Sequence, residues 1–269
     1  MKRKIGNEAK DRIILPLDVS SVAEARGLVD LLVPHVGLFK VGLEFIYSTI
    51  AGLLLRGDEE AVVLLKEVRA LAKALGAEHV FWDGKLCDIP NTVKGASIAI
   101  SGMGVNMFNV HASAGIEAVK AAVANKGHSL VLGVTVLTTI GKLADGTDEC
   151  VSIFGDTAPG KVIQFAAGLE QVGADGIICS PQELRALTEA GSNLLKVTPG
   201  VRPEWATAND QKRVMTPGEA IKAGADYLVI GRPITKPPAE IGGPVEAAKR
   251  IAVEIQEALI ALDDGVADD

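Results

Sequence analysis

Aromatic residues are scarce in this sequence: they make up only 4% of its 269 residues, although 48% are hydrophobic. A hydrophobic core must therefore be built from Val, Ile, Leu and Ala. Aliphatic cores of this kind are typical of parallel β-sheets whose strands are buried on both faces. A chain of this length can bury such a core without disulfide bonds or a structural metal.

Cysteine is also rare, and the three residues Cys87, Cys150 and Cys179 are far apart. Because no C-x-x-C pair is present, neither a zinc site nor a disulfide framework is expected, and a reducing compartment is the natural location. No hydrophobic run approaches the roughly 18 residues of a membrane span. The charged N-terminal residues lack the apolar centre of a signal peptide. We therefore expect a cytoplasmic protein that is not inserted in a membrane.

The sequence has no excess of positive charge, since 34 Asp and Glu residues outnumber 27 Lys and Arg residues. The net charge of −7 argues against a nucleic acid or a membrane surface as partner. A few local basic residues could still bind a phosphorylated small molecule. No group of His, Cys and carboxylate residues has the spacing of metal ligands, so no metal site is expected.

Short aliphatic segments alternate with helix-patterned segments along the whole chain, which is typical of repeated βα units. Eight such units in series, joined by right-handed crossovers, favour a closed barrel. We therefore predict a single-domain (β/α)8 TIM barrel over residues 1–269, with frayed tails at 1–11 and 263–269. The predicted strands are 13–18, 38–42, 79–83, 106–111, 130–135, 176–179, 194–198 and 227–231. The main predicted helices are 22–32, 92–102, 116–125, 161–172, 181–189, 217–223 and 244–261.

Two segments depart from a regular repeat. Residues 52–75 carry two helical patterns separated by residues 56–59, so the second βα unit is predicted to be enlarged. The sequence suggests no role for this extra helical segment, residues 56–75. Residues 141–157 are rich in Gly, Asp and Thr and predict a long loop after the fifth strand.

Charged residues gather where the first three predicted strands end. Asp83 and Lys85 are two residues apart in an extended segment and therefore point to the same side. Lys40 lies between apolar neighbours in the second strand, where burial is costly unless it faces partners. Asp18 ends the first strand. These four residues are predicted to converge at the carboxyl end of the barrel, where barrel active sites lie. A rim of ordinary surface salt bridges is the alternative interpretation.

The last two predicted strands end in sequences that contain Gly and Arg. Gly200 and Arg202 follow the seventh strand, while Gly231 ends the eighth and Arg232 follows it directly. The loops after these two strands form a recurrent phosphate site in β/α barrels. We therefore predict a phosphate site here, with Gly231 as a simple strand end as the alternative. His111, which ends the fourth strand, could be catalytic, but a structural histidine is favoured.

Residues 83–92 resemble the D-x-K-x-x-D-I-P-N-T signature of the orotidine 5'-phosphate decarboxylase family. The resemblance covers almost the whole chain, in the order Leu17-Asp18, Lys40-Val41-Gly42, Asn109-Val110-His111-Ala112, Val134-Thr135-Val136-Leu137-Thr138, Thr198-Pro199-Gly200-Val201-Arg202 and Gly231-Arg232-Pro233. It implies conversion of orotidine 5'-phosphate to uridine 5'-phosphate in pyrimidine biosynthesis, without a cofactor, by a homodimer with shared active sites. Gly84 and Cys87 depart from the Leu and His of many members, but neither position is one of the charged residues of the signature.

The resemblance implies a catalytic network of alternating charges made by Lys40, Asp83, Lys85 and Asp88. Lys85 would protonate the pyrimidine carbon that loses carbon dioxide, and Asp83 would lie beside the departing carboxylate. Asp88 would reach the active site of the neighbouring subunit. Because no electron sink such as pyridoxal phosphate is implied, a preorganised cation must stabilise the developing carbanion.

The resemblance also implies the contacts of the substrate. Asp18 and Lys40 would hold the ribose hydroxyls, while Ile89 and Thr92 would accompany Asp88 into the partner's site. The other implied contacts are a base pocket lined by Thr138 and a phosphate site formed by Arg202, Gln211, Gly231 and Arg232. The loop 202–211 would act as a lid.

Two other functions are considered. One is a magnesium-dependent decarboxylase of a sugar phosphate, on a barrel with the same D-x-K-x-x-D pattern. The run of residues 88–92 and the position of Thr138 favour the nucleotide enzyme instead. The other is a catalytically silent, phosphate-binding barrel that serves as a regulatory subunit. The intact cluster of Lys40, Asp83, Lys85 and Asp88 argues against it, because burying these charges is costly.

Overall fold

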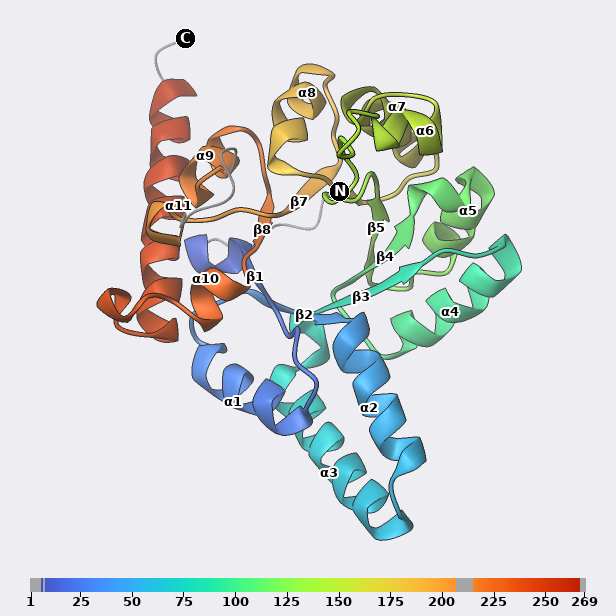
Figure 1. The fold of residues 1–269 in the computed structure, drawn as a ribbon, viewed down its shortest axis with the longest axis vertical. Coiled ribbons are helices and arrows are strands. Elements are labelled where there is room, and N and C mark those ends of the chain that lie inside the picture. The colour runs from blue at the N-terminus through green and yellow to red at the C-terminus, as the bar shows by residue number, and fades with distance from the viewer. Residues whose placement is uncertain (1–5, 7, 207–214, 267–269) are drawn as a thin grey trace.

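The computed structural model describes residues 6, 8–206 and 215–266 and confirms the predicted (β/α)8 TIM barrel. All neighbouring strands are parallel, and β1 pairs with both β2 and β8, which closes the barrel (Figure 1). The strands are β1 Ile13–Pro16, β2 Leu38–Gly42, β3 Val80–Leu86, β4 Met107–His111, β5 Leu130–Val134, β6 Gly176–Ile178, β7 Leu195–Pro199 and β8 Tyr227–Val229.

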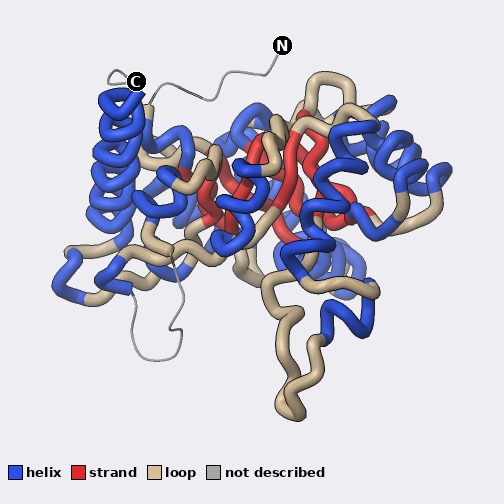
Figure 2. The backbone as a smooth tube through the Cα atoms, turned by 90° about the horizontal axis from the view of Figure 1, so that it is seen from above, coloured by secondary structure: helices blue, strands red, loops and turns tan. Residues whose placement is uncertain are grey.

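Helices surround this barrel, as Figure 2 shows from a second direction. The α-helices are α1 Val22–Leu32, α2 Leu43–Leu55, α3 Asp58–Leu75, α4 Pro90–Gly102, α5 Ile116–Ala124, α6 Glu149–Phe154, α7 Ala158–Gln171, α8 Leu184–Glu189, α9 Pro217–Lys222, α10 Arg232–Thr235 and α11 Pro244–Val266. Short 3-10 helices are η1 Ala9–Arg12, η2 Ala77–His79, η3 Ala112–Ala114, η4 Pro181–Glu183, η5 Glu204–Ala206 and η6 Ala239–Ile241. Within the described part of the chain, no helix is both long and apolar enough to cross a membrane.

The core has two layers because successive side chains of a strand point to opposite faces. In β4, Met107 packs inside the barrel, whereas Phe108 packs between the barrel and the helices; both are fully buried. Large aliphatic side chains and Phe81 fill the barrel interior around Met107. The interior is therefore a packed core, which leaves the rim at the carboxyl ends of the strands for a site.

Helix α1 illustrates how the local sequence determines where a helix begins and which of its faces is buried. The Ser21 side chain accepts a hydrogen bond from the backbone N–H of Glu24 at 3.2 Å, which caps the helix. Ala25, Val29 and Leu32 follow at helical spacing, and all three are fully buried. This apolar stripe seats the helix against the barrel.

The second βα unit is enlarged, as predicted. Helices α2 and α3 both lie between β2 and β3, and they project away from the barrel (Figure 1). Helix α2 begins at Leu43, directly after the last residue of β2. Leu54 and Leu55 at its far end are 76% and 84% exposed.

Several predicted boundaries differ from the structure. Residues 141–157 are not a continuous loop, because α6, Glu149–Phe154, lies within them. Its cap is Asp148, which accepts a hydrogen bond from the backbone of Val151; the polar composition of the segment concealed this short helix. Strand β3 continues past Asp83 to Leu86. Of the expected tails, η1 includes residues 9–11 and α11 reaches Val266, and residues 1–5, 7 and 267–269 lie outside the described residues.

Candidate active site

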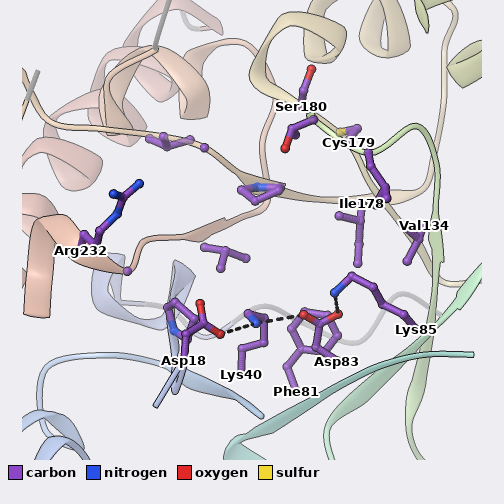
Figure 3. A pocket seen from close by; sticks show the side chains of 18 of the residues that line it. Asp18, Lys40, Phe81, Asp83, Lys85, Val134, Ile178, Cys179, Ser180 and Arg232 are labelled. Carbon is purple, nitrogen blue, oxygen red and sulfur yellow. Dashed lines mark hydrogen bonds and ion pairs between the residues drawn. The ribbon is translucent and has the colours of Figure 1, made fainter. Parts of the chain in front are cut away.

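A pocket of about 390 Å³ opens at the carboxyl ends of the strands. Such a volume is typical of sites for small molecules. Strands from both halves of the barrel contribute to it, as Figure 3 shows. Among the residues that line it are Asp18, Lys40, Asp83, Lys85, Val134, Thr138, Ile178, Ser180, Gly200, Arg202, Gly231 and Arg232.

The four charged residues from β2, β3 and the segment after β1 converge in this pocket. The Lys40 ammonium lies 3.1 Å from Oδ1 of Asp18 and 2.9 Å from Oδ2 of Asp83. The Lys85 ammonium lies 2.7 Å from Oδ1 of Asp83. Negative and positive groups therefore alternate along one continuous chain of contacts (Figure 3).

Electrostatic interactions keep the centre of this chain charged. Burial lowers the pKa of Lys40, but Asp83 and Asp18 outweigh this effect and raise the pKa above its ordinary value. Burial raises the pKa of Asp83, but Lys40 and Lys85 outweigh it and hold the pKa below its ordinary value. At neutral pH the buried pair is therefore an ammonium and a carboxylate.

A β-bulge places Lys85 in the pocket. Trp82 pairs with Phe108 and Leu86 pairs with Val110, so residues 83–85 all lie opposite Asn109. Lys85 has φ +48°, the single positive value among the described residues other than glycine. Bulges change the direction of a side chain at the end of a strand and are common next to active sites. Here the bulge brings the Lys85 ammonium back to the carboxylate of Asp83.

Two further residues, Asn109 and Gly42, lie beside the network and were not predicted as parts of the site. Asn109 on β4 is 1% exposed and donates a hydrogen bond to Asp83 at 2.6 Å. Gly42 ends β2, where an added Cβ would lie only 2.8 Å from Nζ of Lys40. A buried amide between Phe108 and Val110 was the available signal for Asn109. Gly42 belongs to one of the sequence runs that carry the family resemblance, but its close contact with Lys40 could not be predicted from the sequence.

His111 ends β4 near the same charges. Burial lowers its pKa, the positive charge of Lys85 lowers it further, and Asp83 opposes both effects with a smaller influence. A neutral imidazole is therefore expected at neutral pH.

The two arginines that follow the last two strands also line the pocket. Arg232 begins α10, directly after Gly231, and lies across the pocket from Lys85 (Figure 3). Arg202 and Thr138 line the same pocket. One pocket thus presents alternating charges at one end and the guanidinium group of Arg232 at the other, and Arg202 also lines it.

Three of the described residues that were predicted to contact substrate are not among those that line this pocket. Asp88, Ile89 and Thr92 lie at the start of α4, and all three are exposed, Ile89 by 65%. The Asp88 side chain accepts a hydrogen bond from the backbone N–H of Ile89 at 2.7 Å. Gln211 and most of the predicted lid lie outside the described residues. In the part of the chain that the structure describes, no group of three or more His, Cys, Asp or Glu residues is arranged to hold a metal ion.

Comparisons with known proteins agree over most of the chain. Residues 11–251 match the model of the orotidine 5'-phosphate decarboxylase / HUMPS family. Orotidine 5'-phosphate decarboxylase of Moorella thermoacetica is 42% identical over 95% of this chain and 96% of its own length. The enzyme of the same name from Geotalea daltonii is 42% identical over 93% of this chain and 98% of its own length. The crystal structure of orotidine 5'-phosphate decarboxylase from Lactobacillus acidophilus superposes with a TM-score of 0.68 at 28% identity, over 90% of this chain and 98% of that one.

Proposed function

The chain belongs to the orotidine 5'-phosphate decarboxylase / HUMPS family, and from this premise we propose that it converts orotidine 5'-phosphate to uridine 5'-phosphate and carbon dioxide. The observation that carries the proposal is the series of contacts Asp18–Lys40–Asp83–Lys85, centred on the buried Asp83, which shares one pocket with Arg202 and Arg232. A substrate with a reacting carboxylate at one end and a phosphate at the other matches this distribution of charge.

The reaction requires a cation where negative charge develops. Breaking the bond between the ring carbon and its carboxylate releases carbon dioxide and leaves the electron pair on that carbon. The Lys85 ammonium stabilises this charge and then donates the proton that completes uridine 5'-phosphate. Asp83, ionised and 5% exposed, lies beside the substrate carboxylate and raises its energy before the bond breaks.

The end of the pocket across from Lys85 supplies binding energy. Arg232 and Arg202 would bind the phosphate through charge-assisted hydrogen bonds, together with Gly231 and Gln211. Binding energy released there can hold the ring in place over Lys85. Asp18 and Lys40 would contact the ribose hydroxyls, and Thr138 the base.

The proposed function is tested by following the ultraviolet absorbance of orotidine 5'-phosphate in the presence of EDTA. We expect turnover to survive exhaustive chelation, since the proposed mechanism assigns the electrostatic role to Lys85. Loss of turnover that magnesium restores would instead favour a metal-dependent decarboxylase of a sugar phosphate.

The free thiols of Cys87, Cys150 and Cys179 support a cytoplasmic location, where thiols stay reduced.

A two-fold dimer with shared active sites is part of the proposal. Asp88, Ile89 and Thr92 are exposed at the start of α4, beside Lys85 in sequence and outside its pocket. An isologous interface would carry these residues into the partner's pocket and the partner's residues back.

Complementation between two inactive variants tests this arrangement. Lys85→Ala and Asp88→Asn should each be nearly inactive, but a mixed dimer would have one site with both native residues. Random exchange makes half of the dimers mixed, each with one good site of two, so roughly a quarter of wild-type activity should return. If mixed dimers form and activity stays at the level of the parents, Asp88 does not act across the interface.

A further inference from the structure

The buried side-chain amide of Asn109, on β4, contacts the charge network. Asn109 is 1% exposed and is not among the residues that line the pocket. Its Nδ2 donates to Oδ1 of Asp83 at 2.6 Å, and its Oδ1 accepts from the backbone N–H of Lys85 at 2.7 Å. Both ends of one amide therefore contact the two residues that flank Gly84.

The second of these hydrogen bonds compensates for the irregular pairing of β3. Because residues 83–85 all lie opposite Asn109, this stretch of β3 cannot form a regular ladder with β4. A buried backbone N–H needs an acceptor, and the side chain of Asn109 supplies one to Lys85. It does so at the one non-glycine residue of the described chain that has positive φ, a conformation that persists only where its surroundings hold it.

The first hydrogen bond orients the carboxylate that the lysines share. Oδ1 of Asp83 accepts from Asn109 at 2.6 Å and from the Lys85 ammonium at 2.7 Å, while Oδ2 lies 2.9 Å from the Lys40 ammonium. The carboxylate is therefore held from three directions. The amide adds no charge, so Asp83 keeps the full attraction of both lysines.

We propose that Asn109 is a positioning residue for decarboxylation: it holds the backbone of Lys85 and the carboxylate of Asp83 in the alignment that presents the Lys85 ammonium to the reacting carbon. This inference rests on the proposed decarboxylase function. Because Asn109 is remote from the phosphate end of the pocket, its loss should lower kcat and leave KM and the affinity for product nearly unchanged.

The first experiment compares Asn109→Ala with Ser129→Ala. Ser129 is also buried, and its hydroxyl donates to the carbonyl of Val105 at 2.6 Å, before the start of β5 and outside the pocket lining. Misplacement of a reacting group can cost about 100-fold, and we expect a loss of kcat of that order in Asn109→Ala alone. The Kd for uridine 5'-phosphate should stay close to that of the wild type. An unchanged kcat, or a parallel loss of product affinity, would overturn the proposal.

A second variant separates positioning from general stability. Asn109→Asp keeps the acceptor for Lys85 but loses the donor to Asp83 when the introduced carboxyl is ionised. Lys40 from β2, Asp83 and Lys85 from β3, and His111 on β4 are the titratable groups near this position. As pH falls, protonation of the introduced carboxyl restores a donor, so kcat relative to wild type should rise. Asn109→Leu can form neither hydrogen bond and should show no such rise.

A folded Asn109→Asp variant whose relative kcat does not change with pH would overturn the role of the donor. Wild-type turnover is measured first. Its absence would reject the decarboxylase function and the inference with it. Wild-type turnover with unaffected Asn109 variants would reject the inference alone.

Discussion

Replacing Gly42 with alanine tests whether the position of Lys40 controls catalysis, because the substitution touches the network without replacing any of its members. Gly42 has φ −99°, which alanine adopts without strain, so the backbone can stay in place. The added Cβ would lie 2.8 Å from Nζ of Lys40 and 3.4 Å from Oδ1 of Asp18. The ammonium must therefore withdraw by roughly half an ångström or more to reach an ordinary van der Waals separation.

The expected magnitude follows from the contacts that Lys40 would lose. Its side chain is 13% exposed and lies 2.9 Å from Asp83 and 3.1 Å from Asp18, so water can replace these contacts only in part. A hydrogen bond to a charged group contributes about 1.5–3 kcal/mol. Losing one of the two should lower kcat/KM for orotidine 5'-phosphate by roughly 10- to 100-fold.

The assay is steady-state decarboxylation, with Gly27→Ala as the matched control. Gly27 lies in α1, and an added Cβ there meets no atom within 4 Å. The control should keep wild-type activity and gain about 0.5–1 kcal/mol of stability, since alanine is favoured over glycine within a helix. A Gly42→Ala variant with kcat/KM within about twofold of wild type would refute the reasoning, because that change is well below 1 kcal/mol.

Three other predictions address the network and the phosphate end. Lys85→Ala should lower kcat by several orders of magnitude while uridine 5'-phosphate still binds; a variant that retains about a tenth of kcat, a loss of only about 1.4 kcal/mol, would contradict the proposed role. Arg232→Ala should lower kcat/KM at least about tenfold for orotidine 5'-phosphate but hardly for orotidine, whereas equal losses would indicate a structural role. The pKa of Asp83 is lower in the folded protein than in the unfolded chain, where it is near 3.8. The ionised carboxylate therefore stabilises the folded protein fully above the unfolded-state pKa, and this stabilisation is lost as pH falls through the folded-state pKa. The difference in unfolding free energy between wild type and Asp83→Asn, measured with urea, should therefore shrink in strong acid, and a constant difference would contradict it.

The fold could be predicted because strands buried on both faces leave aliphatic segments that alternate with amphipathic helices. Each of the eight predicted strands overlaps an observed one. The end of β3 was not predicted, because Gly84 and Lys85 are not residues typical of β-strands. Only the pairing with β4 extends β3 to Leu86. Helix α6 was missed because six residues within a polar segment give too short a pattern for a helical period.

The charged part of the site could be predicted for a topological reason. In a closed parallel barrel every strand ends at the same rim, so Asp18, Lys40 and Asp83 must meet once their strands are identified. The contact of Asn109 with Lys85 depends on a shift of register between two strands, and that shift is not encoded in either strand alone. The position of Asp88 outside the pocket could not be predicted from the neighbouring residues either, and its proposed role in a partner's site would depend on a second chain.

The closure of the barrel by β8 has a consequence for how the protein is made. The four charged residues Asp18, Lys40, Asp83 and Lys85 are synthesised early. Strand β1, however, acquires its second neighbour only when β8, Tyr227–Val229, has been synthesised. Until then the nascent polypeptide exposes two unpaired edges, on β1 and on the last strand formed, and such edges pair readily with other chains. Translation that stops before residue 227 would therefore yield a product that aggregates, even though it already carries every residue of the charge network.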